Sequence, residues 1–248
     1  PSEALSVVSL MELNNTILSL PGPLPKQAIT QRLMDSDVSD DLYQAVAQVV
    51  QEACLSKRMH RHTIEFYGET WLMQGIANLP HIAKWPAITA LGQAYADWPL
   101  LVVCAGPSLD KNLHLVHELK GHCLIMAVSQ ALKAMQAAGI DPDFVITADP
   151  QAMLYNFDGT ILNRIGALIF SATVQPELFQ LPAQHVLTFG TNNMLDDWIY
   201  EGLGDDGRIE AGGSVSSSAL GVALRWGCNP VAFIGQDLAF SEGKYYAQ

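Results

Sequence analysis

The sequence LLVVCAGPS, residues 100–108, joins a run of five apolar residues to a tight turn. An uninterrupted apolar run of this length is typical of a strand that is buried on both faces of a parallel sheet. After the turn, leucine and valine recur at helical spacing as far as residue 119, and Gly121 can then end a helix in a left-handed conformation. A buried strand, a turn and an amphipathic helix form the repeating unit of parallel α/β proteins.

The same alternation continues along the chain. Short apolar runs predict further strands at residues 123–128, 144–147, 167–170, 186–189 and 231–234. Helical patterns cover residues 130–138 and 215–226. Strands that alternate with helices pair in parallel through right-handed crossovers. The predicted fold class is therefore α/β, with a Rossmann-like, mainly parallel sheet and helices on both faces.

Residues 1–97 have a different character and are predicted to form a mostly helical N-terminal region. Helices are expected to begin at Asp40 and at Ile64, and the second should end before Pro80, because a residue that precedes proline is disfavoured in helical conformation. Residues 98–248 are then the Rossmann-like nucleotide-binding domain. Since the chain lacks an initiator methionine and stops abruptly, we expect a segment of a longer protein, with this domain truncated at its C-terminal end.

The charge balance restricts the class of partner. The chain carries 13 Lys and Arg against 25 Asp and Glu, a formal net charge of −12. Nucleic acid and anionic membrane surfaces require basic surfaces and are not expected as partners, whereas one phosphate needs only a few oriented amides. Four widely spaced cysteines without a Cys-x-x-Cys motif favour a reduced, cytoplasmic setting. No apolar run reaches transmembrane length, and no signal peptide is visible.

Small and polar residues follow the predicted strands at their carboxyl ends, where open α/β sheets bind ligands. The candidates for nucleotide or phosphate contact are Gly106, Pro107, Ser108, Asp149, Thr191, Asn192, Gly213, Ser214 and Gln236. Asp237, which follows the last strand, is the candidate catalytic base. For both Asp149 and Asp237, a capping or turn role explains the sequence equally well.

The turn Gly106-Pro107-Ser108 has the chemistry of a phosphate site. Glycine permits close approach of a ligand, proline opens a helix without losing a needed N–H, and the first amides of a helix attract an anion. An ordinary strand-to-helix turn with a serine cap explains the same residues. The pattern is neither G-x-G-x-x-G nor a Walker A loop, and Asp110 replaces the glycine that a nucleophile elbow requires. These mismatches exclude the NAD, P-loop NTPase and serine hydrolase interpretations.

Gly212-Gly213-Ser214 repeats this device before the second long helix, with a flexible loop and a serine cap as the alternative interpretation. Two helix N-termini at one sheet edge would hold two parts of one nucleotide. His114 and His117 lie three residues apart on a predicted helix but lack a third ligand, so no metal-binding residues are assigned.

Several motifs occur together in an order that resembles a known family. They are VCAGPSLDKN at residues 103–112, AGIDPDFV at 138–145, Asp149-Pro150, GGSV at 212–215, and GCNPVAFIGQDL at 227–238. This series is similar to the motility accessory factor family of bacterial flagellin glycosyltransferases. The same domain type is shared with archaeal-type 6-hydroxymethylpterin pyrophosphokinases. The resemblance covers about residues 60–248.

The resemblance implies a fold like that of the CMP-sialic acid transferases. It implies transfer of a nonulosonic acid, of the sialic or pseudaminic type, from a CMP-sugar donor to serine or threonine of flagellin, as needed for flagellar motility. No tightly bound cofactor is implied. Carried over by motif, the functional residues are Gly106, Pro107 and Ser108 at the donor phosphate, Gly213 and Ser214 at the nucleotide, and Asp237 and Tyr245 as catalytic residues near the sugar.

Two other functions fit the same residues. Transfer of pyrophosphate from ATP to 6-hydroxymethylpterin would require Mg²⁺, which Asp149 and Asp237 would bind. A non-catalytic nucleotide-binding scaffold in flagellar assembly would require no chemistry at these positions. A protein that binds magnesium-ATP and does not bind CMP would favour the kinase. Flagellin modification that survives mutation of Asp237 and Ser108 favours the scaffold.

Overall fold

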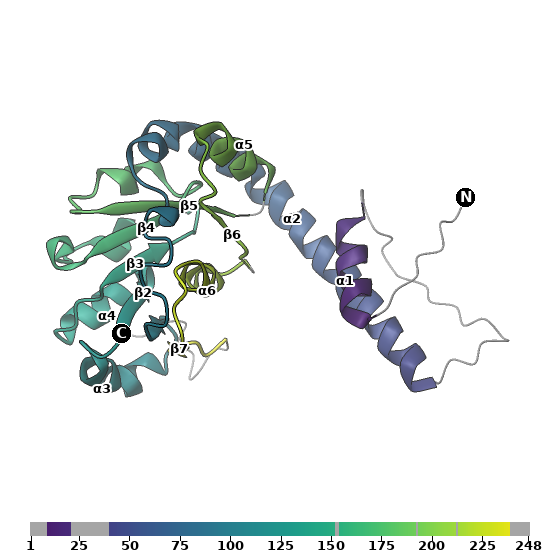
Figure 1. Ribbon diagram of the computed structural model, residues 1–248, viewed down its shortest axis with the longest axis horizontal. Helices are drawn as coiled ribbons and strands as arrows, with labels where there is room; N and C mark the ends of the chain where they lie inside the picture. Colours follow the sequence, from purple (N-terminus) through teal and green to yellow (C-terminus); the bar gives the residue numbers. More distant parts are fainter. Residues whose placement is uncertain (1–8, 21–39, 152–153, 192, 212, 239–248) are drawn as a thin grey trace. The chain divides into compact units, whose positions relative to one another are not determined.

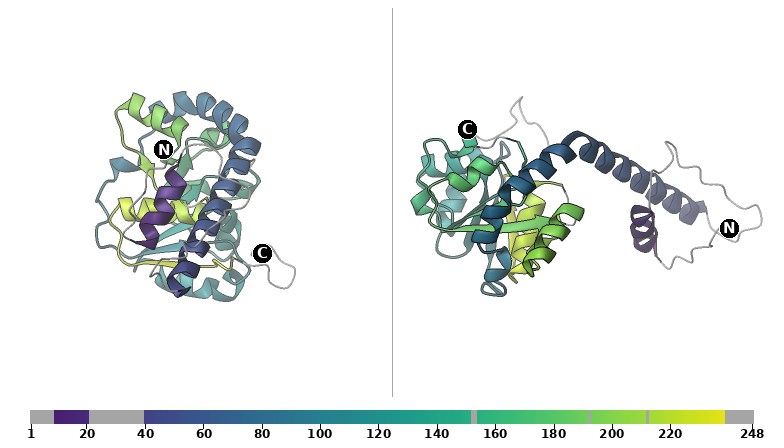
Figure 2. Two further views of the ribbon diagram at one scale, coloured as in Figure 1. Left: turned by 90° about the vertical axis from the view of Figure 1, so that its right-hand side faces the viewer. Right: turned by 90° about the horizontal axis from the view of Figure 1, so that it is seen from above.

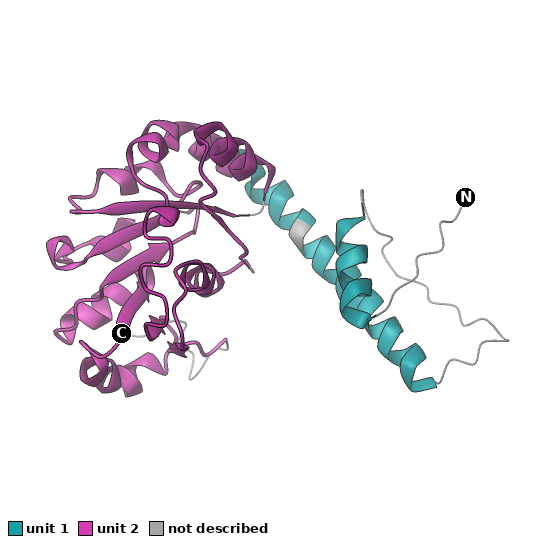
Figure 3. Cartoon of the chain, viewed as in Figure 1, with its two compact units in different colours: residues 1–69 teal, residues 70–248 magenta. Residues whose placement is uncertain are grey.

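The structure is a computed structural model that describes residues 9–20, 40–151, 154–191, 193–211 and 213–238. The chain divides into two compact units, Pro1–Glu69 and Thr70–Gln248 (Figure 3). The boundary falls inside one long helix. All strands of the sheet belong to the second unit.

The first unit contains helix α1 (Leu10–Ser19) and the first part of helix α2 (Asp40–Lys84). The hydroxyl of Ser9 accepts a hydrogen bond from the N–H of Glu12 (3.1 Å), as a serine at the N-cap does, and this starts α1. The buried apolar side chains of the described part of this unit are those of Ile17, Ala53 and Cys54. The apolar core formed by these described residues is therefore small.

Helix α2 is continuous, which corrects the expected break before Pro80. A proline inside a helix removes a backbone hydrogen bond and costs on the order of 3 kcal/mol. Tertiary contacts offset this cost, because the Asn78 side chain donates to the carbonyls of Ala172 and Val174, and Ile82 beyond the proline is buried. Among the described helices, α2 included, none is both long and apolar enough to cross a membrane.

The second unit is built on a seven-stranded, wholly parallel sheet with strand order β6-β5-β4-β3-β2-β1-β7 (Figures 1 and 2). The strands are β1 (Leu100–Val103), β2 (Leu124–Val128), β3 (Phe144–Thr147), β4 (Ala167–Ser171), β5 (Val186–Thr191), β6 (Arg208–Ile209) and β7 (Val231–Ile234). All six predicted strands are present, and β6 is additional. The α/β, Rossmann-like fold class is therefore confirmed.

The helices of this unit follow the strands. They are α3 (Leu109–Leu119), α4 (Leu132–Ala137), α5 (Met194–Leu203) and α6 (Val215–Arg225), with 3₁₀ turns at Ile88–Ala90, Ser129–Ala131, Leu154–Phe157, Leu162–Arg164 and Pro176–Gln180. Helices α3 and α4 lie on one side of the sheet and α6 on the other (Figure 1). Gly121 has a φ of +86°, the left-handed conformation expected after α3. The helix predicted at 130–138 is shorter than expected, and α5 was not predicted.

The segment between α2 and β1 anchors helix α6 to the sheet. Trp226, at the end of α6, is fully buried, and its Nε1–H donates to the carbonyl of Ile88 (2.9 Å). The indole also packs against the rings of Tyr95 and Phe144, with centroids 5.6 and 4.9 Å away. Because α6 is held at this end, its first turn has a defined position over the carboxyl edge of the sheet.

Candidate functional site

The strand order reverses between β1 and β7. The chain passes from β1 through its neighbours as far as β6, and then returns to place β7 on the other side of β1. In open α/β sheets, ligands bind at such a switch point, beyond the carboxyl ends of the strands. The turns that follow these two strands, residues 105–108 and 235–237, are therefore the first candidates for a functional site.

These two turns contact each other directly. The N–H of Gly106 donates to the carbonyl of Gly235 (2.7 Å), and the N–H of Ser108 donates to Oδ2 of Asp237 (2.9 Å). A Cβ at position 106 would lie 2.5 Å from the Gly235 carbonyl oxygen and closer still to the Asp237 carboxylate. Only glycine fits at position 106 without displacing the second turn.

Asp237 acts as a capping group for helix α3. The hydroxyl of Ser108, which the sequence suggested as a cap, makes no capping hydrogen bond. The carboxylate of Asp237 accepts from the Ser108 N–H instead, and a negative charge is stabilised at the N-terminus of a helix. The Ser108 amide, which was expected to face a phosphate, thus donates to the Asp237 carboxylate. The phosphate-binding role expected of Ser108 and the role of base expected of Asp237 therefore cannot be considered separately.

The start of α6 approaches the same turn. Ser214 and Ser217 form a reciprocal capping box, with the Ser217 N–H donating to Ser214 Oγ (3.1 Å). The amide of Gln236 donates to the hydroxyl of Ser216 (3.1 Å). Gly213 has a φ of +79°, and a Cβ there would meet no atom within 4 Å. Through Gln236 and Asp237, neighbours in sequence, the turn after β7 contacts the first turns of two helices.

The other predicted site residues lie elsewhere along the sheet edge. Asp149 follows β3, and Thr191 is the last residue of β5. These strands lie two and four strands from β1, which is about 10 and 19 Å at the usual strand spacing. Oδ1 of Asp149 accepts from the N–H of Gln151 (2.9 Å), the hydrogen bond of an aspartate turn. Tyr245 and Asn192 lie outside the described residues.

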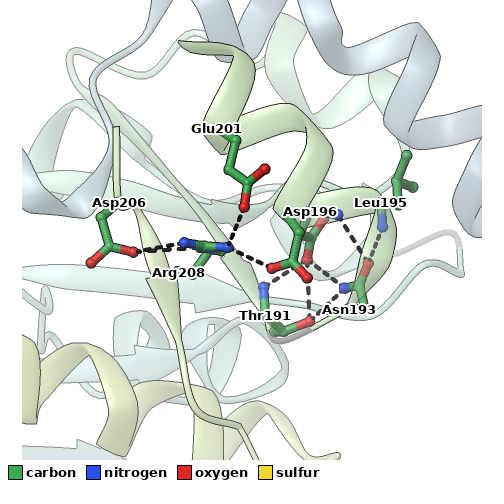
Figure 4. A network of polar contacts seen from close by, with 8 residues as sticks. Thr191, Asn193, Leu195, Asp196, Glu201, Asp206 and Arg208 are labelled. Atoms are coloured by element: carbon green, nitrogen blue, oxygen red, sulfur yellow. Dashed lines mark hydrogen bonds and ion pairs between the residues drawn. The ribbon is translucent and has the colours of Figure 1, made fainter. Parts of the chain in front are cut away.

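Thr191 belongs to a hydrogen-bond network around the buried side chain of Asp196, in the first turn of α5 (Figure 4). Oδ2 of Asp196 accepts from the N–H of Thr191 (2.6 Å), from its hydroxyl (3.2 Å) and from Nδ2 of Asn193 (2.7 Å). Asp196 is fully buried, and this burial raises the pKa of its carboxyl group. Asp196 is not among the residues predicted from the sequence, although Asn193 followed three residues later by an acidic residue is a recognisable helix start.

The stability of the sheet-bearing unit should carry a pH-dependent contribution from Asp196. An aspartate in an unfolded chain titrates near ~3.9, and since burial raises the pKa of Asp196, the folded state keeps its proton to higher pH. The folded state then binds more protons, so this contribution to stability falls as pH rises above about 4. Asp196→Asn removes it, so the melting temperature of the variant relative to the unmodified protein should rise between pH 4 and pH 7.

The matched control is Asp158→Asn, since Asp158 is an exposed aspartate of the same unit. Thermal unfolding followed by circular dichroism provides the measurement. Melting temperatures that run parallel for Asp196→Asn and the unmodified protein across this pH range would contradict the assignment.

A second polar cluster surrounds Arg208 on β6 (Figure 4). Its guanidinium lies 2.6 Å from Asp197, 3.7 Å from Glu201 and 3.4 Å from Asp206. The hydrogen bond from Arg225 lowers the pKa of Asp206. Two shallow hollows, of about 400 and 550 Å³, lie between β6 and α6 beside this cluster. Because both arginines are already paired with carboxylates, these hollows are poorly suited to a phosphate, and the switch point is the better candidate.

The fold and the switch point define the class of this protein: a Rossmann-like α/β protein whose candidate site lies where the strand order reverses. Residues 74–243, more than half of the chain, match the family described as 6-hydroxymethylpterin diphosphokinase MptE-like. The chain therefore belongs to this family. The family resemblance drawn from the motifs is confirmed.

Two further relatives are similar to parts of the chain. The structure of the MAf glycosyltransferase from Magnetospirillum magneticum AMB-1 has the same fold, with a TM-score of 0.60 and 18% identity over 85% of this chain and 33% of that chain. An uncharacterized protein of Treponema pallidum (strain Nichols) is 26% identical over 116 residues, 45% of this chain and 52% of the relative. The chain thus spans about half of one relative and a third of the other.

Proposed function

We propose that this protein is a glycosyltransferase that moves a nonulosonic acid from a CMP donor to serine or threonine of flagellin, in the cytoplasm. The observation that carries the proposal is the likeness of its fold to the MAf glycosyltransferase over 85% of the chain. The order of the motifs at 103–112, 212–215 and 227–238 supports it, because these segments supply the turns that meet at the switch point.

Each part of the site has a role in this proposal. The donor phosphate binds beside the start of α6, where Gly213 leaves open space and Ser214 and Gln236 supply polar groups. The bond between the anomeric carbon and the phosphate oxygen breaks, CMP leaves with the electron pair, and the acceptor oxygen bonds to that carbon. Polar groups aimed at the phosphate stabilise the charge that develops on it. Asp237 takes the proton of the acceptor hydroxyl.

The remaining sequence-derived candidates keep supporting roles. Pro107 lies in the turn that faces Asp237, and Asp149 shapes the edge beyond β3. Thr191 is tied into the Asp196 network, so its contribution is to hold the edge beyond β5. Tyr245 is assigned near the transferred sugar by the family resemblance alone.

A second candidate is magnesium-dependent pyrophosphate transfer to 6-hydroxymethylpterin, which the description of the matching family favours. This chemistry needs carboxylates that converge on a divalent ion. One oxygen of Asp149 and one of Asp237 accept hydrogen bonds from backbone amides. Within the parts of the chain that the structure describes, no three histidine, cysteine or acidic side chains gather as a metal site. The described residues therefore do not fit a bound divalent ion.

Calorimetric titration separates these functions. CMP and magnesium-ATP are titrated in parallel into this chain and into the longer protein that contains it. The expected result is saturable binding of CMP and no binding of magnesium-ATP. Binding of magnesium-ATP and not of CMP would identify the kinase. If neither CMP nor magnesium-ATP binds to either protein, both enzymatic proposals are overturned.

The acceptor is tested in cells. The intact mass of flagellin is compared with and without the gene, and then with Asp237→Asn in its place. The proposal expects a mass loss of one nonulosonic acid per modified site in both altered strains. Unchanged flagellin mass after gene deletion excludes flagellin as the acceptor.

A further inference from the structure

The backbone amides of the turn at residues 105–108 donate hydrogen bonds to other groups of the protein. The Gly106 N–H donates to Gly235, the Ser108 N–H donates to Asp237, and the Leu109 N–H donates back to the carbonyl of Gly106. Pro107, between them, has no N–H. An anion at this turn would find no amide from residues 106–109 without breaking one of these hydrogen bonds.

The electrostatics also oppose a second anion at this turn. The carboxylate of Asp237 already takes the favourable position at the N-terminus of α3. A phosphate placed beside it would meet a like charge at short range, and the two charges would repel each other. The same turn cannot hold both groups at once.

The shape of the turn is fitted to Asp237. At position 106, a Cβ would clash with the carboxylate of Asp237 and the carbonyl of Gly235, and glycine avoids this clash because it has no side chain. Gly235 has a φ of +70°, and a Cβ there would strike the carbonyl of Cys104. Two glycines, one on each side, allow the backbones to approach until the Asp237 carboxylate reaches the Ser108 N–H.

We infer that the turn Ala105-Gly106-Pro107-Ser108 is a positioning element for the base Asp237, and that the donor phosphate binds elsewhere. The inference rests on the proposed function, because Asp237 is the base only if the protein is a transferase. Fixing Oδ2 on the Ser108 amide sets the orientation of the carboxylate, so that it can accept the proton of the acceptor hydroxyl. Gly106 and Ser108 act through Asp237 and do not touch the donor.

Kinetics of the longer protein distinguish a positioning turn from a phosphate cradle. Gly106→Ala should lower kcat by a factor on the order of 10²–10⁴, the usual contribution of a general base, and should change the affinity for CMP less than threefold. Asp237→Asn, which keeps an oxygen to accept from Ser108, should lose activity in the same way. Gly202→Ala is the matched control, since a Cβ there meets no atom within 4 Å. A tenfold or larger loss of CMP affinity in Gly106→Ala, with kcat retained, overturns the inference.

A measurement without substrate keeps the two proposals separate. Amide hydrogen exchange of Ser108 is followed by NMR in this chain. Exchange should be slow in the unmodified protein and in Asp237→Asn. It should be fast in Asp237→Ala, which removes the acceptor, and in Gly106→Ala, whose Cβ displaces it. Fast exchange in the unmodified protein overturns the positioning role even if CMP binds. If CMP fails to bind while Ser108 is protected, the proposed function fails and the structural link stands.

Discussion

Trp226→Ala should lower the free energy of unfolding of the sheet-bearing unit by about 3–5 kcal/mol. The indole is fully buried and packs against Tyr95 and Phe144, so truncation leaves a large cavity. It also leaves the Ile88 carbonyl without the indole N–H as its donor. The change is measured by denaturant unfolding followed by far-ultraviolet circular dichroism, because this signal comes mainly from the backbone and not from tryptophan.

The control for this variant is Trp198→Ala, since Trp198 is 61% exposed. Its effect should be less than about 1 kcal/mol, as for most exposed positions. Trp226→Phe separates the two causes, because it retains most of the packing and removes only the hydrogen bond, at an expected cost of about 1–3 kcal/mol. A loss below about 1 kcal/mol for Trp226→Ala would show that α6 is anchored by other contacts.

Asn78→Ala should destabilise the same unit by about 2–5 kcal/mol. The side-chain amide is fully buried and donates to two carbonyls, those of Ala172 (2.9 Å) and Val174 (2.7 Å). Alanine leaves both carbonyls buried without this donor, and each such group costs about 1–3 kcal/mol. Asn78→Asp should be worse still, because a carboxylate places an acceptor and a charge against two carbonyl oxygens.

The melting temperature of each variant provides the measurement, with Asn163→Ala, at an exposed position, as the control. If Asn78→Ala melts within about a degree of the unmodified protein, the continuation of α2 through Pro80 must have another cause. Helix content measured at the same time shows whether α2 then ends before the proline, as the local sequence would favour.

Much of the fold follows from local patterns. Continuous apolar runs mark strands buried on both faces, and β1 to β5 are buried along nearly their whole length. The break predicted at Pro80 was wrong, because the preference of a proline is local and the tertiary contacts of Asn78 and Ile82 offset its cost. Strand β6 was not predicted, because its two residues, Arg208 and Ile209, are too few to show the alternation of apolar and polar residues that identifies a strand.

The candidate site was predicted in outline. Residues at the carboxyl ends of parallel strands share one edge, so Gly106, Ser214 and Asp237 were expected on it from sequence alone. Their grouping depends on strand order, which no local pattern specifies. Thr191 shares that edge but lies four strands from β1, and its hydroxyl is bound to Asp196.

The turn at residues 105–108 shows most clearly which features follow from the local sequence and which depend on the tertiary structure. Its amino acids alone establish a strand, a glycine where the backbone is approached closely, and the start of a helix, because these follow from local sterics and periodicity. What approaches Gly106 is settled by β7 pairing with β1, which brings Asp237 to the Ser108 amide from 129 residues away. Such a contact depends on the order of strands across the whole sheet, so it exists only in the folded unit.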